Sequence, residues 1–295
     1  MNELVNPLTE IRTKRLRRRQ LRFLTVNSER TIGLVALSLL IAAFILVPIF
    51  SVYGTQKIVA EPNAAPTVSH LFGTDNLGRD VFTRAFAGGR IDVLIAALAV
   101  LTSLAIGTAV GVMIGLTRSR FLGTVGLRVI DSVLAIPFVI LVLSLVIVLG
   151  AESRLLGLPE GVGTVALAIV LVDWAIYARI ARSQAAVLRD REFVEAARLL
   201  RFSRVRVLFR HVIPNVLPTT ASYGATDAVL VILGVASLAF LGSGIQEPTP
   251  ELGNIMYQGH NYLATSWWIT VLPGVLLVTL GAALALIGDS FSEDD

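Results

Sequence analysis

The chain has 295 residues, of which 55% are hydrophobic and only 16% are charged. Soluble domains carry about 25% charged residues, so this composition indicates a membrane protein. The absence of cysteine excludes a disulfide framework, a thiolate metal site and a cysteine nucleophile. The three histidines, His70, His211 and His260, lie far apart in the sequence. We therefore expect three unrelated polar positions and no metal site.

A basic arm, residues 1–30, opens the chain. Basic clusters can bind nucleic acid, but beside an apolar segment they act as an orientation signal for a membrane span. We therefore predict a cytoplasmic arm and no nucleic-acid partner. The cluster consists of Arg12, Lys14, Arg15, Arg17, Arg18, Arg19 and Arg22.

Six apolar stretches are long enough to cross a bilayer as helices. The first has a longer apolar core than a signal peptide, and no clear cleavage site follows it, so we expect it to be retained. The sequence thus predicts an all-α polytopic membrane protein with about six transmembrane helices. The predicted spans are 31–50, 91–116, 128–149, 162–181, 216–241 and 268–288.

Lysine and arginine residues set the orientation, because they favour the cytoplasmic side of a membrane. With six spans, the basic arm, the connection 117–127 and the block 182–213 fall on one side and hold most of these residues. We therefore place them in the cytoplasm with both termini, including the tail 290–295. The loop 51–90 is then external.

The external loop contains a segment that favours a short surface helix over 76–87. Asp75 is placed to cap its N-terminus, and Gly88-Gly89 follow its end. Asp80 and Arg84 are four positions apart with the acid first, which is the favourable order for a helical ion pair. Two roles are open for this segment: a structural brace, or contact with a delivered substrate or its binding protein. Later in the chain, "QEPTPELG" predicts an extended run and then a polar helix over about 251–263 at the outer mouth.

Small residues recur within the second span. Gly107, Gly111 and Gly115 are four positions apart, which lets helices approach closely in a membrane. We interpret this row as a packing feature. Prolines should kink helices or mark their ends; they are Pro137, Pro214, Pro218 and Pro273.

Two acidic residues, Asp173 and Asp227, fall inside predicted spans. A mid-span Asp costs ~2.5–3.5 kcal/mol on insertion scales, so it usually faces the bundle interior or water. Both are candidates to line a translocation path, and Asp227 is the favoured one. Asp173 has Arg179 or Tyr177 as a partner nearby in the sequence, whereas Asp227 has no obvious local partner. An alternative is a catalytic carboxylate pair in an intramembrane enzyme.

The cytoplasmic block contains "REFVEAARLLRFSRVRVLFRHVIPN", residues 191–215. A helix over 184–200 would carry one narrow apolar face, and Ser203 is placed to cap a second short helix over 204–211. Such a face suits insertion into a partner's groove, although an ordinary solvated connector remains open. The face consists of Phe193, Ala196, Ala197 and Leu200.

The "EAA" of Glu195–Ala197, followed by Pro214 in "RHVIPN", resembles the cytoplasmic signature of ABC importer permeases. Four further stretches resemble the dipeptide/oligopeptide branch of that family, and the subunit looks like the second, "C", permease of a heterodimeric pair. They are "HLFGTDNLGRDVFTRAFAGGRIDV", "IDSVLAIPFVIL", "WAIYARIARSQ" and "SLAFLGSGIQEPTPELGNIMYQGHNYLATSWWITVLPG". The resemblance extends over residues 70–289. Its external motif contains Gly73, Thr74, Asp75, Gly78, Arg79 and Asp80.

The resemblance implies a type I ABC importer transmembrane fold over 91–289. It also implies that the loop 182–213 docks on the ATP-hydrolysing subunits. The family usually has glycine where this chain has Arg201, so either Arg201 adopts a strained left-handed conformation or the turn is built differently. The implied docking residues are Phe193, Glu195, Ala196, Ala197, Leu200, Arg201, Phe202 and Ser203.

The implied function is peptide uptake by alternating access in a prokaryotic cytoplasmic (inner) membrane. The implied partners are a second homologous permease, two ABC ATPase subunits and an external solute-binding protein. The chain has no GxxxxGK[ST] motif, so we expect ATP and Mg²⁺ on the ATPase subunits, and no cofactor, metal or catalytic residue here. Alternatives are nickel or oligosaccharide cargo, a secondary transporter driven by an ion gradient, and an intramembrane enzyme.

Overall fold

The computed structural model describes residues 7–150, 153–155 and 157–292. The side chains of the basic cluster predicted within residues 1–30, and the end of the predicted tail, 293–295, lie outside the described part of the chain. The described chain is helical, with two isolated β-bridges in the loop before α2. Its principal helices are α1 (Pro7–Phe50), α2 (Val81–Leu116), α3 (Arg120–Leu134), α4 (Phe138–Leu149), α5 (Val162–Leu188), α6 (Glu192–Leu199), α7 (Arg204–Val207), α8 (Ile213–Phe240), α9 (Leu252–Gly259) and α10 (Trp268–Ser292).

Five helices are long and apolar enough to cross a membrane, and the pair α3–α4 raises the number to six if it counts as one span. The predicted span 128–149 is therefore not one straight helix. Its two parts meet at 88°, with the break at Ala135–Pro137. Pro137 has no N–H to donate within a helix and its ring clashes with the preceding turn, which explains the break.

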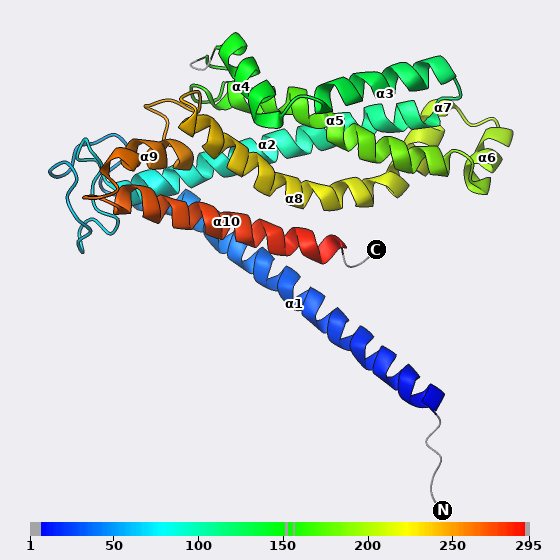
Figure 1. The fold of residues 1–295 in the computed structure, drawn as a ribbon, viewed down its shortest axis with the longest axis horizontal. Coiled ribbons are helices and arrows are strands. Elements are labelled where there is room, and N and C mark those ends of the chain that lie inside the picture. The colour runs from blue at the N-terminus through cyan, green and yellow to red at the C-terminus, as the bar shows by residue number, and fades with distance from the viewer. Residues whose placement is uncertain (1–6, 151–152, 156, 293–295) are drawn as a thin grey trace, which may run out of the picture.

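The helices α2, α5 and α8 lie side by side in the bundle, with α3–α4 on one side and α10 and α1 on the other (Figure 1). Glycines hold α2 and α5 close together. A Cβ on Gly107 would lie 2.3 Å from the Trp174 carbonyl oxygen, and one on Gly111 would lie 2.3 Å from that of Ala178. The row of small residues therefore packs helices, as its spacing predicted.

The prediction of a short surface helix over 76–87 is wrong. The helix α2 begins at Val81 and continues without interruption to Leu116, and its N-cap is Asp80, not Asp75. The two glycines expected to end the short helix lie inside α2, where they allow close packing. A Cβ on Gly88 would come within 3.0 Å of the Leu252 backbone nitrogen, and one on Gly89 within 2.5 Å of the Phe44 ring.

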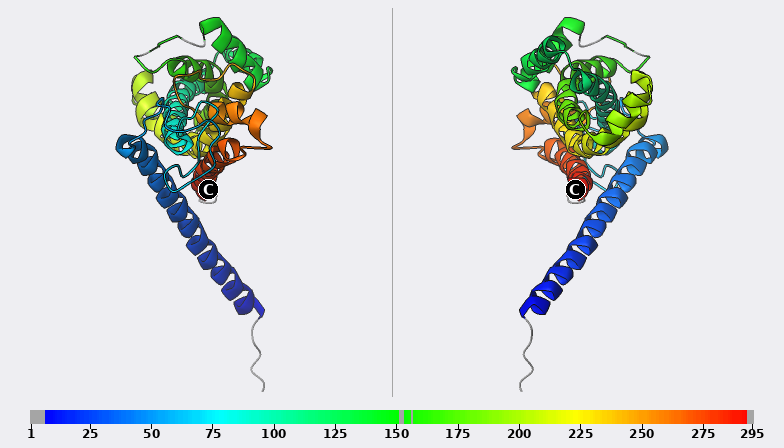
Figure 2. Two further views of the ribbon diagram at one scale, coloured as in Figure 1. Left: turned by 90° about the vertical axis from the view of Figure 1, so that its left-hand side faces the viewer. Right: turned by 90° about the vertical axis from the view of Figure 1, so that its right-hand side faces the viewer.

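The predicted external and cytoplasmic loops lie at opposite ends of the bundle. The loop 51–80 and α9 lie at one end and α6 and α7 at the other, and α10 runs from the first end toward the second (Figure 1). The helix α1 packs against α10, with Gly33 against Ile287, and its N-terminal part projects away from the bundle (Figure 2). The predicted cytoplasmic loop thus lies at the end toward which α10 runs, in agreement with the predicted topology.

Candidate functional site

The loop 182–213 is helical, but not with the predicted bounds. The expected separate helix 204–211 is wrong, because α7 continues through a π-helical turn, Leu208–Val212, directly into α8. The expected helix 184–200 is divided, because α5 ends at Leu188 and α6 begins at Glu192. A turn separates them, in which the Arg191 N–H donates to the Leu188 carbonyl at 3.1 Å. The helix α7 begins at Arg204, as the sequence predicted, and Ser203 caps it: the Arg206 N–H donates to Ser203 Oγ at 3.2 Å.

Arg201 adopts the left-handed conformation, with φ 56°. This geometry turns the chain back at the end of α6, so that the Phe202 N–H donates to the Ala197 carbonyl at 3.1 Å. Such a bond satisfies one of the carbonyls that a helix leaves unpaired at its C-terminus. Of the two alternatives that the sequence left open, the structure has the left-handed one, with arginine at a position where glycine is favoured.

The apolar residues of α6 point in two directions. Val194 and Ala197 are buried in a cluster with residues of α2, α5 and α8. The predicted apolar face is therefore not uniform, because Ala197 faces the bundle whereas the other three predicted residues are exposed. We call the exposed set the docking patch; it consists of Phe193, Ala196, Leu199 and Leu200. Exposed contiguous apolar side chains commonly mark an interaction surface.

The remaining predicted docking residues support the turn after α6. The guanidinium of Arg206 lies 5.1 Å from the centre of the Phe202 ring, and that ring stacks with His211 at 6.1 Å. Glu195 is exposed on α6. Phe202 and Ser203 therefore shape the loop, whereas Glu195 is available at its surface.

The external motif folds into a compact turn before α2. Gly73 and Gly78 have positive φ angles of 67° and 76°, which other residues rarely adopt. Thr74 Oγ1 donates to the Glu61 carbonyl at 2.6 Å. Asp75 accepts hydrogen bonds from the Arg79 N–H at 2.9 Å and from Arg79 Nε at 2.7 Å. The motif is therefore internally bonded, as expected of a structural brace.

Asp80 is the residue that joins this turn to α2. Its carboxylate accepts from the Thr83 N–H at 2.8 Å and from the Thr83 hydroxyl at 2.7 Å, which caps the helix. It also lies 3.0 Å from Nδ1 of His70. The expected helical pair of Asp80 with Arg84 is absent among the described ion pairs, since Arg84 contacts Asp75 and Glu247.

Glu247, in the segment after α8, forms ion pairs with both Arg79 and Arg84. Its Oε1 lies 2.6 Å from Arg79 Nη2 and 2.9 Å from Arg84 Nη2. Burial alone would raise the pKa of Glu247, but the hydrogen bond from Arg79 and the charges of both arginines outweigh it and lower that pKa. This carboxylate therefore stays ionised and ties the motif to the end of α8.

A fully buried carboxylate, Glu251, positions α9. Glu251 caps this helix, accepting from the N–H groups of Gly253 at 2.6 Å and Asn254 at 2.7 Å. Burial raises the pKa of Glu251, and its backbone hydrogen bonds offset only part of that effect. The Leu252 N–H donates to Asp92 on α2 at 3.3 Å. The outer helix α9 is thus held against α2, with its bounds close to the predicted 251–263.

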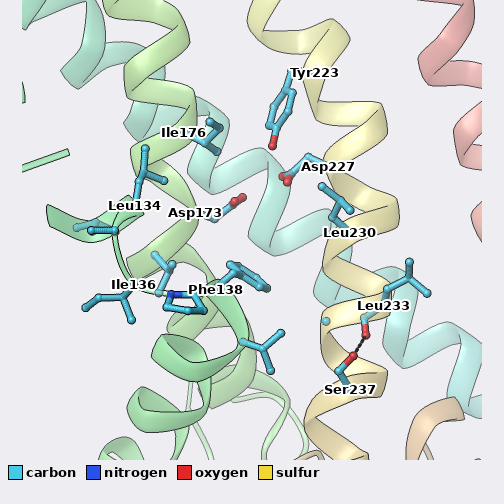
Figure 3. Close-up of a pocket in the computed structure, with 16 residues that line it drawn as sticks. Leu134, Ile136, Phe138, Asp173, Ile176, Tyr223, Asp227, Leu230, Leu233 and Ser237 are labelled. Carbon is cyan, nitrogen blue, oxygen red and sulfur yellow. Dashed lines mark hydrogen bonds between the residues drawn. The ribbon is translucent and has the colours of Figure 1, made fainter. Parts of the chain in front are cut away.

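Within the bundle, the structure brings together the two aspartates that the sequence singled out. Asp173 on α5 and Asp227 on α8 extend toward each other beside a cavity (Figure 3). Tyr177 donates to Asp227 Oδ2 at 2.8 Å, so it is the partner of Asp227 and not, as one expectation had it, of Asp173. The other expected partner, Arg179, pairs with Asp131 on α3.

Several residues of these sites were not predicted from the sequence. Tyr223 lies beside the aspartates and packs edge-on against Tyr177, with ring centres 5.3 Å apart. Its position four residues before Asp227 is a usable signal, because both then lie on one helix face. Glu247 offered no comparable signal, since its partners Arg79 and Arg84 are more than a hundred residues away in the chain. Among the described residues, no group of three or more His, Cys, Asp or Glu side chains could hold a metal ion.

Comparisons with known proteins place this architecture in a family. The family model for the inner membrane component of binding-protein-dependent transport systems matches residues 107–293. The chain is 31% identical over 274 residues to the dipeptide transport system permease protein DppC of Alkalihalophilus pseudofirmus, covering 90% of this chain and 85% of that protein. It is 33% identical over 270 residues to a putative peptide permease protein of Brucella suis, covering 90% and 86%.

The fold has a solved counterpart. A chain of the MetNI methionine ABC transporter, in an inward-facing conformation, superposes with a TM-score of 0.57 at 18% identity, covering 72% of this chain and 95% of that one. This similarity confirms the predicted all-α fold of a type I ABC importer transmembrane subunit. Together with the family match, it confirms a permease subunit of the inner membrane. The chain belongs to the family of inner membrane components of binding-protein-dependent transport systems.

Proposed function

We propose that this permease imports peptides, and that it forms their path together with a second homologous permease. The observation that carries the peptide cargo is the similarity, over 90% of this chain, to a dipeptide permease and to a putative peptide permease. Transport is favoured over an intramembrane enzyme by the family membership. An external solute-binding protein delivers the peptide to the end of the bundle that carries α9 and the external motif.

The docking patch receives the ATP-hydrolysing subunits. It is apolar and exposed at the end of the bundle opposite the external motif. Because Val194 and Ala197 on the other face of α6 are buried against α2, α5 and α8, a force on the patch is transmitted to three spans. Two cytoplasmic ABC ATPase subunits hold ATP and Mg²⁺, since this chain has no phosphate-binding loop of the GxxxxGK[ST] type.

The cycle is alternating access. Closure of the two ATPase subunits on ATP moves α6, and the spans attached to it open the path outward. Hydrolysis then returns the bundle to the inward-facing state. Such coupling requires two conformations that differ in their contacts at both the docking patch and the path. Asp173 and Asp227, which lie beside a cavity between α5 and α8, line this path.

The test is a substitution on the exposed face of α6. Ala196→Glu places a charge within the docking patch and should abolish ATP-driven peptide uptake and co-purification of the ATPase subunits, while the permease still inserts in the membrane. Glu192→Gln, at the first residue of α6 and outside the patch, is the matched control and should retain both. Ala197 is less suitable, because it is buried in the permease's own packing. Normal uptake and co-purification in Ala196→Glu would contradict docking at this patch.

A further inference from the structure

A cavity of about 600 Å³ lies between the α3–α4 bend, α5 and α8 (Figure 3). Most of its wall is apolar, with side chains such as Leu134, Phe138, Ile176 and Leu230. The ionisable groups in its wall are Asp173, Asp227 and Tyr223. The cavity therefore combines an apolar surface with acidic groups concentrated on one part of it.

The acidic groups are deeply buried. Asp173 is 6% exposed and Asp227 is 2% exposed. Asp227 accepts the hydroxyl hydrogen of Tyr177, whereas Oδ2 of Asp173 is buried without a hydrogen-bond partner among the described residues. A buried carboxylate oxygen left without a donor is costly. Asp173 thus presents an unsatisfied acceptor in the wall of the cavity.

In the described part of the chain, no cationic side chain forms an ion pair with Asp173 or Asp227. Arg179, the arginine nearest to Asp173 in the sequence, is paired with Asp131 on α3. Two carboxylates that share a site of low polarity repel each other when both are ionised. A cation placed between them removes that repulsion and supplies donors to the open oxygen. The pair can therefore hold either one shared proton or a positively charged ligand.

We infer that this cavity binds an ammonium group of the transported molecule, with Asp173 and Asp227 on the cation and the apolar wall against its carbon skeleton. This inference rests on the proposed function, since it assigns a ligand class to the path. An ammonium group has three N–H donors and no acceptor, which matches a pair of carboxylates. Charge-assisted hydrogen bonds of this kind are stronger than neutral ones.

A metal ion fits the cavity less well. Calcium takes six to eight oxygen ligands, and magnesium requires a near-ideal octahedron. No set of three or more His, Cys, Asp or Glu side chains that could hold a metal was found in the described part of the chain. The apolar wall around the pair is also unsuited to the water molecules that would complete a metal's coordination. A cation with an apolar body satisfies both parts of the wall.

The inference can be tested without transport. Membranes that contain the whole importer are treated with diisopropylcarbodiimide, a neutral reagent for carboxyl groups, and labelling of each aspartate is followed by mass spectrometry. n-Butylammonium should slow labelling of Asp173 and Asp227 about tenfold at a concentration at which n-butanol has no effect, because hydrogen bonds to charged groups are worth about a factor of ten or more. Labelling of Asp131, which lies outside the cavity, should not change.

Substitutions then test whether protection from labelling depends on Asp173 and Asp227 together. In Asp173→Asn, protection of Asp227 by butylammonium should be lost, whereas in Asp131→Asn it should persist. Trialanine and N-acetyl-lysine amide, used as protecting ligands, distinguish a peptide's terminal ammonium from that of a side chain. Equal protection by butanol, no protection, or no labelling of either aspartate would each overturn the inference, the last because a site open to a cation is open to a small reagent.

The outcome is separable from that of the proposed function. ATP-driven uptake of peptide by the same importer tests the cargo. An importer that takes up peptide but whose aspartates are not protected overturns the ammonium site alone. An importer whose aspartates are protected by ammonium but that takes up no peptide overturns the peptide cargo alone.

Discussion

Buried Arg84 on α2 forms an ion pair with the partly exposed Glu247 after α8, with 2.9 Å between Nη2 and Oε1. The two residues are 163 positions apart in the chain. The same carboxylate binds Arg79, and both arginines also contact Asp75. One charged network therefore connects the external motif, the outer end of α2 and the segment leading to α9, so these parts are expected to move as a unit.

Arg84→Ala should strongly destabilise the permease. The Arg84 side chain is 2% exposed, and it also donates to the Thr55 carbonyl at 2.9 Å. Its buried partner is Asp75, whose side chain is 3% exposed, and removing one partner of a buried pair costs about 3–5 kcal/mol. Thermal unfolding in detergent measures the loss. Arg154→Ala is the control: its pair with Glu160 is on the surface, with the Arg154 side chain 74% exposed, and should cost about 0–1 kcal/mol. Similar losses in both variants would contradict a buried network.

The same network predicts a pH dependence. Because the pKa of Glu247 is lowered in the folded chain, its ionised form stabilises the fold above its ordinary pKa of 4.5, and this contribution disappears as the pH falls through the lowered value. The wild-type protein should therefore have a higher melting temperature than Glu247→Gln at pH 7, and the difference should shrink below pH 4.5. A difference that is the same at both pH values would show that Glu247 acts by packing alone.

The contact of α2 with α5 should tolerate no side chain at Gly111. In Gly111→Ala the new Cβ would meet the Ala178 carbonyl oxygen at 2.3 Å, so the helices must separate. Overpacking of this kind costs about 1–3 kcal/mol, measured as a lower melting temperature in detergent. The matched control is Gly123→Ala in α3, where the nearest atom is 3.6 Å away. It should be neutral or slightly stabilising, because alanine favours a helix.

Arg201→Gly should stabilise the turn after α6. A left-handed residue other than glycine costs roughly 1–2 kcal/mol, and Arg201 has φ 56°. Glycine removes this strain, so the melting temperature should rise while uptake is retained. Arg201→Ala keeps the strain but removes the guanidinium. If the alanine variant is as stable as the glycine variant, the gain comes from losing the charged side chain and not from the backbone.

The sequence by itself determined the membrane class, the apolar segments and the end of the bundle on which each loop lies. These properties depend on local composition, because a bilayer requires about twenty apolar residues for a span and basic residues favour one side. The motif around Glu195 and the external motif were sufficient to identify the family. The row from Gly107 to Gly115 also predicted correctly that this face of α2 packs closely.

The tertiary structure alone decided which residues meet. Periodicity within a helix extends to three or four positions, so it placed Asp80 with Arg84 and Asp173 with Tyr177. In the folded chain, Arg84 binds Glu247 and Tyr177 binds Asp227. Local sequence signals also predicted that a helix ends at Gly88-Gly89. In the structure α2 continues through both glycines, which are needed there because α1 and α9 pack closely against them. Partners far apart in the chain are selected by helix packing, whose energy depends on all the contacting elements and is absent from any single segment.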